Sequence, residues 1–383
     1  PLIVDVKTPD SSFLLSSETN LAIKGKMPLD EKMLLKRFKA INETEYFIEE
    51  INLKNSTTTL FIPFKELTAL KNRILFILRD SKEMLAPIEV PALKNINNNT
   101  IIPTLSVLID SEKDVVLCKQ SLATFYFQLP SDFTNKTARL IELFTKNKKL
   151  VPWFPSVLIG ENYKHAVEFM QQIQPKQIVT NNFGIAHEAD VLGILWIAGP
   201  FLNIANSYAL KCLKENFNCT GAFIANELSR HQIRFIRKPE DFKLYYSIYH
   251  PITLMSSRQC FFQTTVGCEK TRMDKNCMPL CKKTATLTNL KKETFFIDKS
   301  KGNYNTIFNE TNFLNTKIIN DVPNRFSVFM IDLREIKTNT KAVAGKSQLI
   351  SLFGDYLSGI EGAGEQLQQT IFPTTCTQYK KGI

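Results

Sequence analysis

The chain has 383 residues, of which 44% are hydrophobic and 22% are charged, so it can bury a large core. This composition excludes an intrinsically disordered chain and a fibrous protein. The 48 basic and 37 acidic residues give a net charge of +11, which favours an acidic partner, with RNA or DNA as the leading candidates. The lysines are scattered, so a solvated Lys-rich surface is the alternative interpretation.

The sequence shows no membrane span and no secretion leader. Its longest apolar stretch, around residues 195–205, is interrupted by Gly199, Pro200 and Asn203. No basic-then-apolar segment stands at the start, so we expect a cytoplasmic protein without a membrane partner. Because the chain opens on Pro1, we also expect a fragment of a longer protein.

Residues 1–90 are predicted to form a small α+β domain. Asp30 can cap a helix, residues 45–62 have strand-like character, and an amphipathic helix is expected after Pro63. The Asn-rich residues 91–100 are predicted to be a linker.

From residue 101 onward, short apolar strands alternate with amphipathic helices. The predicted strands are Pro103–Ile109, Ala123–Gln128, Ser156–Ile159, Gln177–Thr180, Trp196–Leu202, Gly221–Ala225, Ile252–Met255 and Ser327–Ile331. The predicted helices include Tyr163–Ile173, Ser207–Asn216 and Glu227–Arg237. This alternation predicts a (β/α)8-barrel-like α/β domain over 101–340, with a doubly wound open sheet as the runner-up and a helix and tail over 341–383.

Polar residues follow several predicted strands, at the end where parallel barrels carry their chemistry. Among them are Asn203, Asn206 and Glu227, and a Cys-rich loop over residues 256–283 follows another strand. We therefore expect the loop to lie at the functional face of the barrel.

Four of the eight cysteines, Cys260, Cys268, Cys277 and Cys281, lie in this loop with the spacing C-x7-C-x8-C-x3-C. Four neighbouring thiolates are stable only if a metal centre neutralises their charge. Zinc sites usually pair their cysteines in two tight knuckles, whereas a four-iron cluster accepts wider spacings. The spacing therefore favours a 4Fe-4S cluster, with zinc as the second and disulfides as the third interpretation.

At this loop the sequence resembles the collagenase-like peptidases of unassigned-class family 32. The resemblance rests on the segments Leu254–Ser257, Asn203–Ser207, Gly302–Asn305 and Gln378–Ile383, and on the cysteines. Residues 20–80 look like the collagenase-associated domain of the longer members. The longer members begin with another barrel domain, so an N-terminal barrel half of the full-length protein is an expected partner.

The resemblance implies two different chemistries. The family carries a peptidase name, but its better-understood branches hold a 4Fe-4S cluster on four cysteines and hydroxylate RNA bases or a quinone precursor. Carried over, the metal ligands would be Cys260, Cys268, Cys277 and Cys281. The RNA-directed branches use a small organic acid as oxygen source.

The residues themselves support a peptidase poorly. The histidines form no HExxH motif, and no Gly-x-Ser-x-Gly sequence occurs. Glu227 and His231 are four residues apart and could share a helix face, either to hold a substrate or simply as a helix pair. Arg258 and Arg234 are candidates for binding a small carboxylic acid, although Arg258 could instead screen thiolate charge. Asp332, Arg334 and Glu335 follow the last predicted strand and either line the pocket or pair with each other.

We therefore predict an enzyme that takes part in hydroxylation of an RNA base (rRNA or tRNA). Its predicted catalytic residues are Arg258, Glu227 and His231, and its predicted cofactor-binding residues are Asn203, Asn206 and Arg234. The alternatives are a peptidase and a non-catalytic half that binds RNA or a partner.

Overall fold

The computed structural model describes residues 1–25, 27–39, 41, 46–54, 59–79, 91–93, 101–133, 136–270, 274, 277, 281, 285–300 and 304–382. The chain divides into two compact units, Pro1–Pro91 and Ala92–Ile383. None of the helices in the described part of the chain is both long and apolar enough to cross a membrane.

The N-terminal unit combines a β-hairpin with two helices. The antiparallel strands are β1 (Ile3–Lys7) and β2 (Ser12–Ser16), and the helices are α1 (Glu31–Phe38) and α2 (Phe64–Leu78). The Asp30 carboxylate accepts a hydrogen bond of 2.6 Å from the Met33 backbone N–H, which caps α1 as expected. Leu67 and Leu70 of α2 are fully buried in the small core.

The strand predicted over residues 45–62 is wrong for the residues that the structure describes there. They contain only an isolated bridge between Phe61 and Ala22. Ile48, Ile51 and Leu53 pack against the core as partly buried side chains. The apolar side chains of this segment therefore half-bury an irregular stretch of chain. The segment does not extend the sheet, in which β1 and β2 pair with each other.

The larger unit is a closed barrel of eight parallel strands. In order around the barrel they are β3 (Thr104–Ile109), β4 (Thr124–Gln128), β5 (Val151–Phe154), β6 (Gln177–Thr180), β7 (Leu195–Ala198), β8 (Cys219–Phe223), β9 (Lys243–Ser257) and β13 (Val328–Asp332). The β8–β9, β9–β13 and β13–β3 pairings close the ring. The barrel prediction is confirmed, and the open-sheet alternative is wrong because both of its would-be edges are paired.

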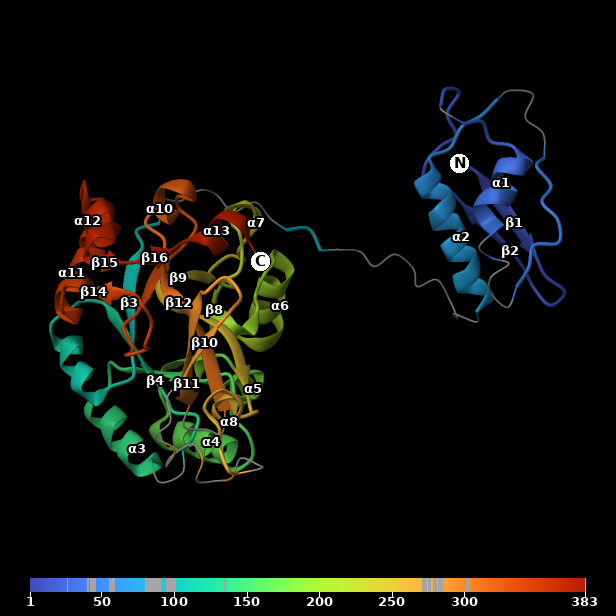
Figure 1. Ribbon diagram of the computed structural model, residues 1–383. Coiled ribbons are helices and arrows are strands. Elements are labelled where there is room, and N and C mark those ends of the chain that lie inside the picture. Colours follow the sequence, from blue (N-terminus) through green and yellow to red (C-terminus); the bar gives the residue numbers. More distant parts are fainter. Residues whose placement is uncertain are drawn as a thin grey trace. The chain divides into compact units, whose positions relative to one another are not determined.

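Helices cover the outside of the barrel (Figure 1). In chain order they are η2 (Glu112–Lys119), α3 (Thr137–Lys146), α4 (Glu161–Ile173), α5 (Phe183–Val191), α6 (Ser207–Phe217), α7 (Arg230–Phe235), α10 (Ile318–Asp321) and α11 (Lys346–Leu357). The 3-10 turn η3 (Pro200–Leu202) instead follows β7 at its carboxyl end. Asn182, Asn206 and Ser229 start α5, α6 and α7 by accepting backbone N–H groups, so short polar side chains set where these helices begin.

Aromatic side chains fill the inside of the barrel. Trp153 packs against Phe223 with ring centroids 5.3 Å apart, and Phe223 packs against Tyr245 at 4.9 Å. Tyr126 contacts Trp153 from β4. The interior is therefore a packed core, and chemistry is confined to the barrel ends.

A long excursion separates β9 from β13. It contains α8 (Phe261–Val266) and the antiparallel strands β10 (Thr286–Thr288), β11 (Thr294–Ser300) and β12 (Tyr304–Leu314). Beyond the barrel, β9 continues and pairs with β12. Residues 341–383 add α11 and the elements β14 (Lys341–Ala342), α12 (Ala363–Thr370), β15 (Ile371–Phe372), β16 (Thr374–Thr375) and α13 (Thr377–Lys381).

Four element boundaries differ from the prediction. The strand expected at 156–159 corresponds to β5, which ends earlier, at Phe154. Its short length and the proline at position 152 hide its strand pattern in the sequence. The strand expected at 252–255 is only the outer part of β9. The strand expected at 196–202 stops at Ala198, because Pro200 starts a 3-10 turn. The helix expected at 227–237 is shorter, because Ser229 and Gln232 form a capping box.

Candidate functional site

The carboxyl ends of β4 and β13 carry a buried ion pair. Asp332 is the last residue of β13, and its Oδ2 lies 2.6 Å from Nη2 of Arg334. The Arg334 Nε donates to the same carboxylate at 2.9 and 3.1 Å, and Nη1 approaches the Gln128 Oε1 at 3.5 Å. Burial lowers the pKa of Arg334, but the hydrogen bond and charge of Asp332, together with Asp110 and Asp298, raise it on balance. The two side chains therefore satisfy each other's hydrogen-bonding groups.

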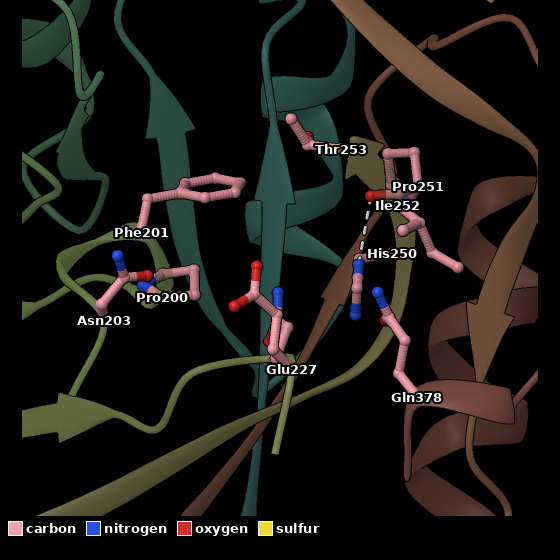
Figure 2. Close-up of a pocket in the computed structure, with 10 residues that line it drawn as sticks. Pro200, Phe201, Asn203, Glu227, His250, Pro251, Ile252, Thr253 and Gln378 are labelled. Carbon is pink, nitrogen blue, oxygen red and sulfur yellow. Dashed lines mark hydrogen bonds between the residues drawn. The ribbon is translucent and has the colours of Figure 1, made fainter. Parts of the chain in front are cut away.

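The other side of the barrel mouth holds a small polar pocket. It lies at the carboxyl ends of β7 and β8 and beside the middle of β9, and a residue of α13, Gln378, completes it. Figure 2 shows His250 and Gln378 on one side of the pocket, with Asn203 and Glu227 on the other. The cavity measures about 30 Å³, enough for roughly one water-sized group.

His250 presents an unpaired nitrogen in this pocket. Its Nδ1 lies 3.1 Å from the Pro251 carbonyl oxygen, so Nδ1 carries the hydrogen and donates it. The other nitrogen, Nε2, is buried and has no hydrogen-bond partner among the described residues, and the same holds for Oε1 of Gln378. Burial lowers the pKa of His250 to about 4, so the ring is neutral at neutral pH. A stacked Phe313, 4.9 Å away, fixes the plane of the ring.

The excursion after β9 crosses the mouth of the barrel. The Tyr304 hydroxyl at the start of β12 makes a buried hydrogen bond of 2.6 Å with Ser131, which follows β4. β4 stands three places around the ring from β9, in the order β9, β13, β3, β4. Asn305, beside Tyr304, donates to the Gln259 carbonyl at 2.9 Å. These two contacts hold the start of the cysteine segment over the carboxyl end of the barrel.

All four predicted ligands, Cys260, Cys268, Cys277 and Cys281, are free thiols in this segment. Cys277 and Cys281 share one turn, since the Cys281 N–H donates to the Cys277 carbonyl at 3.1 Å. Among the described residues, no three His, Cys, Asp or Glu side chains are arranged to hold a metal ion. The donor chemistry thus fits a metal centre, while the structure does not gather the four sulfur atoms.

Two hydrogen-bond donors already face the Cys277 sulfur. The Asp274 backbone N–H lies 3.3 Å from the Sγ atom, and the Lys270 ammonium lies 3.8 Å from it. Lys270 also pairs with the Asp274 carboxylate at 2.6 Å. The Cys277 sulfur is therefore held by contacts from its own segment.

The structure brings together only some of the other predicted site residues. Asn203 and Glu227 line the pocket, whereas Asn206 caps α6 by accepting from the Ala209 N–H at 2.9 Å. Glu227 precedes α7, so the prediction that it shares a helix face with His231 is wrong.

The remaining candidates lie elsewhere. His231 is an exposed residue of α7 that packs on Phe235, 4.9 Å between ring centroids. Arg234 donates to the Asp321 carbonyl at 3.3 Å. Arg258 is exposed, two residues before Cys260.

Sequence reasoning did not single out His250 or Gln378 as site residues. A single histidine within the apolar run from Leu244 to Ile252 was the available signal for His250. Gln378 was noted only as the start of the resembling segment Gln378–Ile383, and nothing in that segment placed it beside β9, because α13 reaches the pocket only through the closed fold.

Fold and site thus describe an α/β barrel with a thiol-rich segment over its mouth. Residues 159–339, somewhat less than half of the chain, match the family model of peptidase family U32. The matched segment contains the unpaired His250 and all four cysteines of the loop. A search of curated proteins finds no match.

Among solved structures, the chain is similar to the YdjI aldolase from Escherichia coli K12, with 12% sequence identity and a TM-score of 0.28. The likeness covers 38% of this chain and 65% of that chain. The fold assignment therefore rests on the strand pairings of this chain.

Proposed function

We propose that this chain is an iron–sulfur protein that takes part in hydroxylating a base of RNA (rRNA or tRNA), with a small organic acid as oxygen donor. The match to peptidase family U32 supports this proposal, because the chain resembles the branches of that family that carry such clusters and modify RNA. The net charge of +11 suits a polyanionic substrate.

The observation that carries the proposal is the position of the cysteines. Four free thiols lie within one segment that starts over the carboxyl end of the barrel strands. This end is where enzymes with this fold place their chemistry.

In the proposed protein, Cys260, Cys268, Cys277 and Cys281 hold a 4Fe-4S cluster, which supplies one-electron redox chemistry when bound. Lys270 and the Asp274 N–H donate to the Cys277 sulfur and orient it. Arg258 is the proposed contact for the carboxylate of the small acid.

Other residues shape the mouth around this segment. The Ser131–Tyr304 hydrogen bond fixes the start of β12 to the segment that follows β4. Asn203 and Glu227 contribute to the pocket beside it. Asn206, His231 and Arg234, with their contacts in and around α6 and α7, have no part in the proposed chemistry.

Peptidase activity is the second candidate, and the description of the matched family favours it. A peptidase needs an activated nucleophile or a metal-bound water. Within the described part of the chain, His250 hydrogen-bonds to a backbone carbonyl and His165 pairs with Glu168 at 3.0 Å. No hydroxyl or thiol of the described residues donates to the free Nε2 of His250, and His165 is engaged by Glu168, so neither histidine is paired with a nucleophile.

Comparing RNA from cells with and without the gene tests the proposal. We expect nucleoside mass spectrometry to find one nucleoside, heavier by one oxygen, that disappears on deletion and returns with the wild-type gene. Cys277→Ser should fail to restore it, while the matched variant Cys212→Ser, at an exposed thiol of α6, should restore it.

Three other outcomes would overturn the proposal. Identical nucleoside profiles in all strains would exclude RNA hydroxylation. Peptide cleavage by the purified protein that survives Cys277→Ser would favour the peptidase. RNA binding without any modified nucleoside would favour the non-catalytic half of a longer enzyme.

A further inference from the structure

The His250 pocket offers a lone pair that the protein itself does not use. Nε2 of His250 is a hydrogen-bond acceptor, because Nδ1 holds the ring hydrogen. The side chain is buried, with 6% of its surface exposed, and lines the cavity. A buried acceptor without a partner is costly, so a ligand that donates to it gains that free energy.

A second unused acceptor lies next to it. Oε1 of Gln378 is buried and lacks a partner among the described residues. Figure 2 shows the Gln378 side chain extending toward the His250 ring from α13. Rotation of the terminal amide by half a turn exchanges the positions of its oxygen and nitrogen. Because Oε1 makes no hydrogen bond in its present position, this rotation breaks none of its bonds, and Gln378 can present its oxygen to a donor in the pocket.

The charge of the pocket opposes that of the rest of the protein. Glu227 is the one formally charged residue among the described residues that line it, since His250 is neutral. The chain as a whole carries +11. A cationic donor is therefore preferred over a neutral one or an anion. The exposed ring of Phe201 stands at the rim, where it can face a cation.

We propose that the pocket formed by His250, Gln378 and Glu227 binds a primary ammonium group. An ammonium head has three N–H donors and is about as large as a water molecule, which suits three acceptors around about 30 Å³. The ammonium belongs either to a free small amine or to a lysine side chain of another protein. The site does not involve the cysteines and is therefore independent of the proposed cluster.

Histidine NMR gives a direct readout, because the chain has only four histidines. In protein labelled with 13C-histidine, the His250 signal is identified by its loss in His250→Gln. Titration with ethylammonium chloride should move this signal saturably. The ceiling on binding per non-hydrogen atom limits the dissociation constant to about 1 mM or weaker.

Three further probes define the ligand. Tetramethylammonium has the charge without N–H donors, so we expect it not to bind. Potassium chloride supplies a cation without hydrogen-bond donors and should not shift the His250 signal. Nα-acetyl-lysine amide tests the second source: binding equal to that of ethylammonium indicates a lysine side chain, and weaker binding indicates a free amine.

Variants separate the contacts. Gln378→Leu should weaken ethylammonium binding by about tenfold or more, as expected for a hydrogen bond to a charged group, while the melting temperature stays the same. Glu227→Gln should weaken it by up to about fivefold. The matched control Glu365→Gln, in α12 and exposed, should bind normally, and so should Cys277→Ser.

The proposal would be overturned by a pocket that holds only a water molecule. In that case ethylammonium leaves the His250 signal unchanged, and Gln378→Leu alters only stability. Equal shifts with tetramethylammonium or potassium would also contradict it, since neither ion donates a hydrogen bond. Binding that Gln378→Leu and Glu227→Gln both leave unchanged would place the ammonium elsewhere.

Discussion

The two sides of the barrel mouth differ in whether their buried polar groups have hydrogen-bond partners. At β4 and β13, Arg334 satisfies Asp332 with several hydrogen bonds. At β7 to β9, the buried Nε2 of His250 and Oε1 of Gln378 have no partner among the described residues. Paired groups stabilise the fold, whereas unpaired groups are available to a ligand, so the comparison separates scaffold from recognition within one rim.

The largest effect is expected from breaking the paired side. Arg334→Met leaves the Asp332 carboxylate buried without its partner, which should lower the free energy of unfolding by about 3–5 kcal/mol. Urea denaturation measures this loss. The double variant Asp332→Asn/Arg334→Met should recover most of it. A single variant as stable as the wild type would show that the pair does not hold the rim.

The unpaired side should make the free energy of unfolding depend on pH. The pKa of His250 is about 4 in the fold, below its ordinary value of 6.5, so the unfolded state binds the proton more readily between these values. Stability from this group is fully present above about pH 6.5 and lost as pH falls toward 4, by about 3 kcal/mol.

Two charged groups act on His250 in opposite directions: Asp332 raises its pKa and Arg334 lowers it. His250→Gln should flatten the change of unfolding free energy between pH 4 and 6.5, while His231→Gln, at an exposed position, should not. An unchanged profile in His250→Gln would mean that the ring is not buried neutral.

The contact that joins the excursion to the barrel should have a smaller effect. Tyr304→Phe removes the hydrogen bond to Ser131 and leaves a buried hydroxyl unpaired, at a cost of about 1–2 kcal/mol. In this variant we expect amide hydrogen exchange to become faster than in the wild type in β12 and in the described cysteine segment, with β6 as the unaffected reference. Equal exchange in wild type and variant would show that Ser131 does not anchor the excursion.

The smallest expected effect concerns Asn206. Because this residue caps α6, Asn206→Ala should reduce the free energy of unfolding by about 1 kcal/mol and leave ligand binding at the His250 pocket unchanged. Thermal denaturation and the ethylammonium titration measure the two quantities. A loss of binding without a loss of stability would return Asn206 to the site.

The sequence predicted the barrel well because alternating apolar strands and amphipathic helices are local patterns. It misplaced β5, since Pro152 stands inside a strand of only four residues, and it found only the outer half of β9. The cysteine spacing could also be recognised from the sequence, because the four residues lie close together in the chain. Arg334 and Asp332 were left open between pairing and lining, and the structure shows that they pair.

The unpaired site could not be derived from local patterns. His250 is neutral because β12 brings Phe313 against it, and its pocket closes only when α13 places Gln378 beside β9. Both contacts join residues far apart in the chain. By contrast, the expected helix face for Glu227 and His231 was local, and it was wrong because the Ser229 capping box starts the helix later.

Iron, acid-labile sulfide and zinc, measured per chain in protein purified without oxygen, test the central claim most directly. The account predicts about four irons and four sulfides, the composition of a 4Fe-4S cluster, with loss of both in Cys277→Ser and retention in Cys212→Ser. One zinc without sulfide, or a folded protein free of metal, would contradict it.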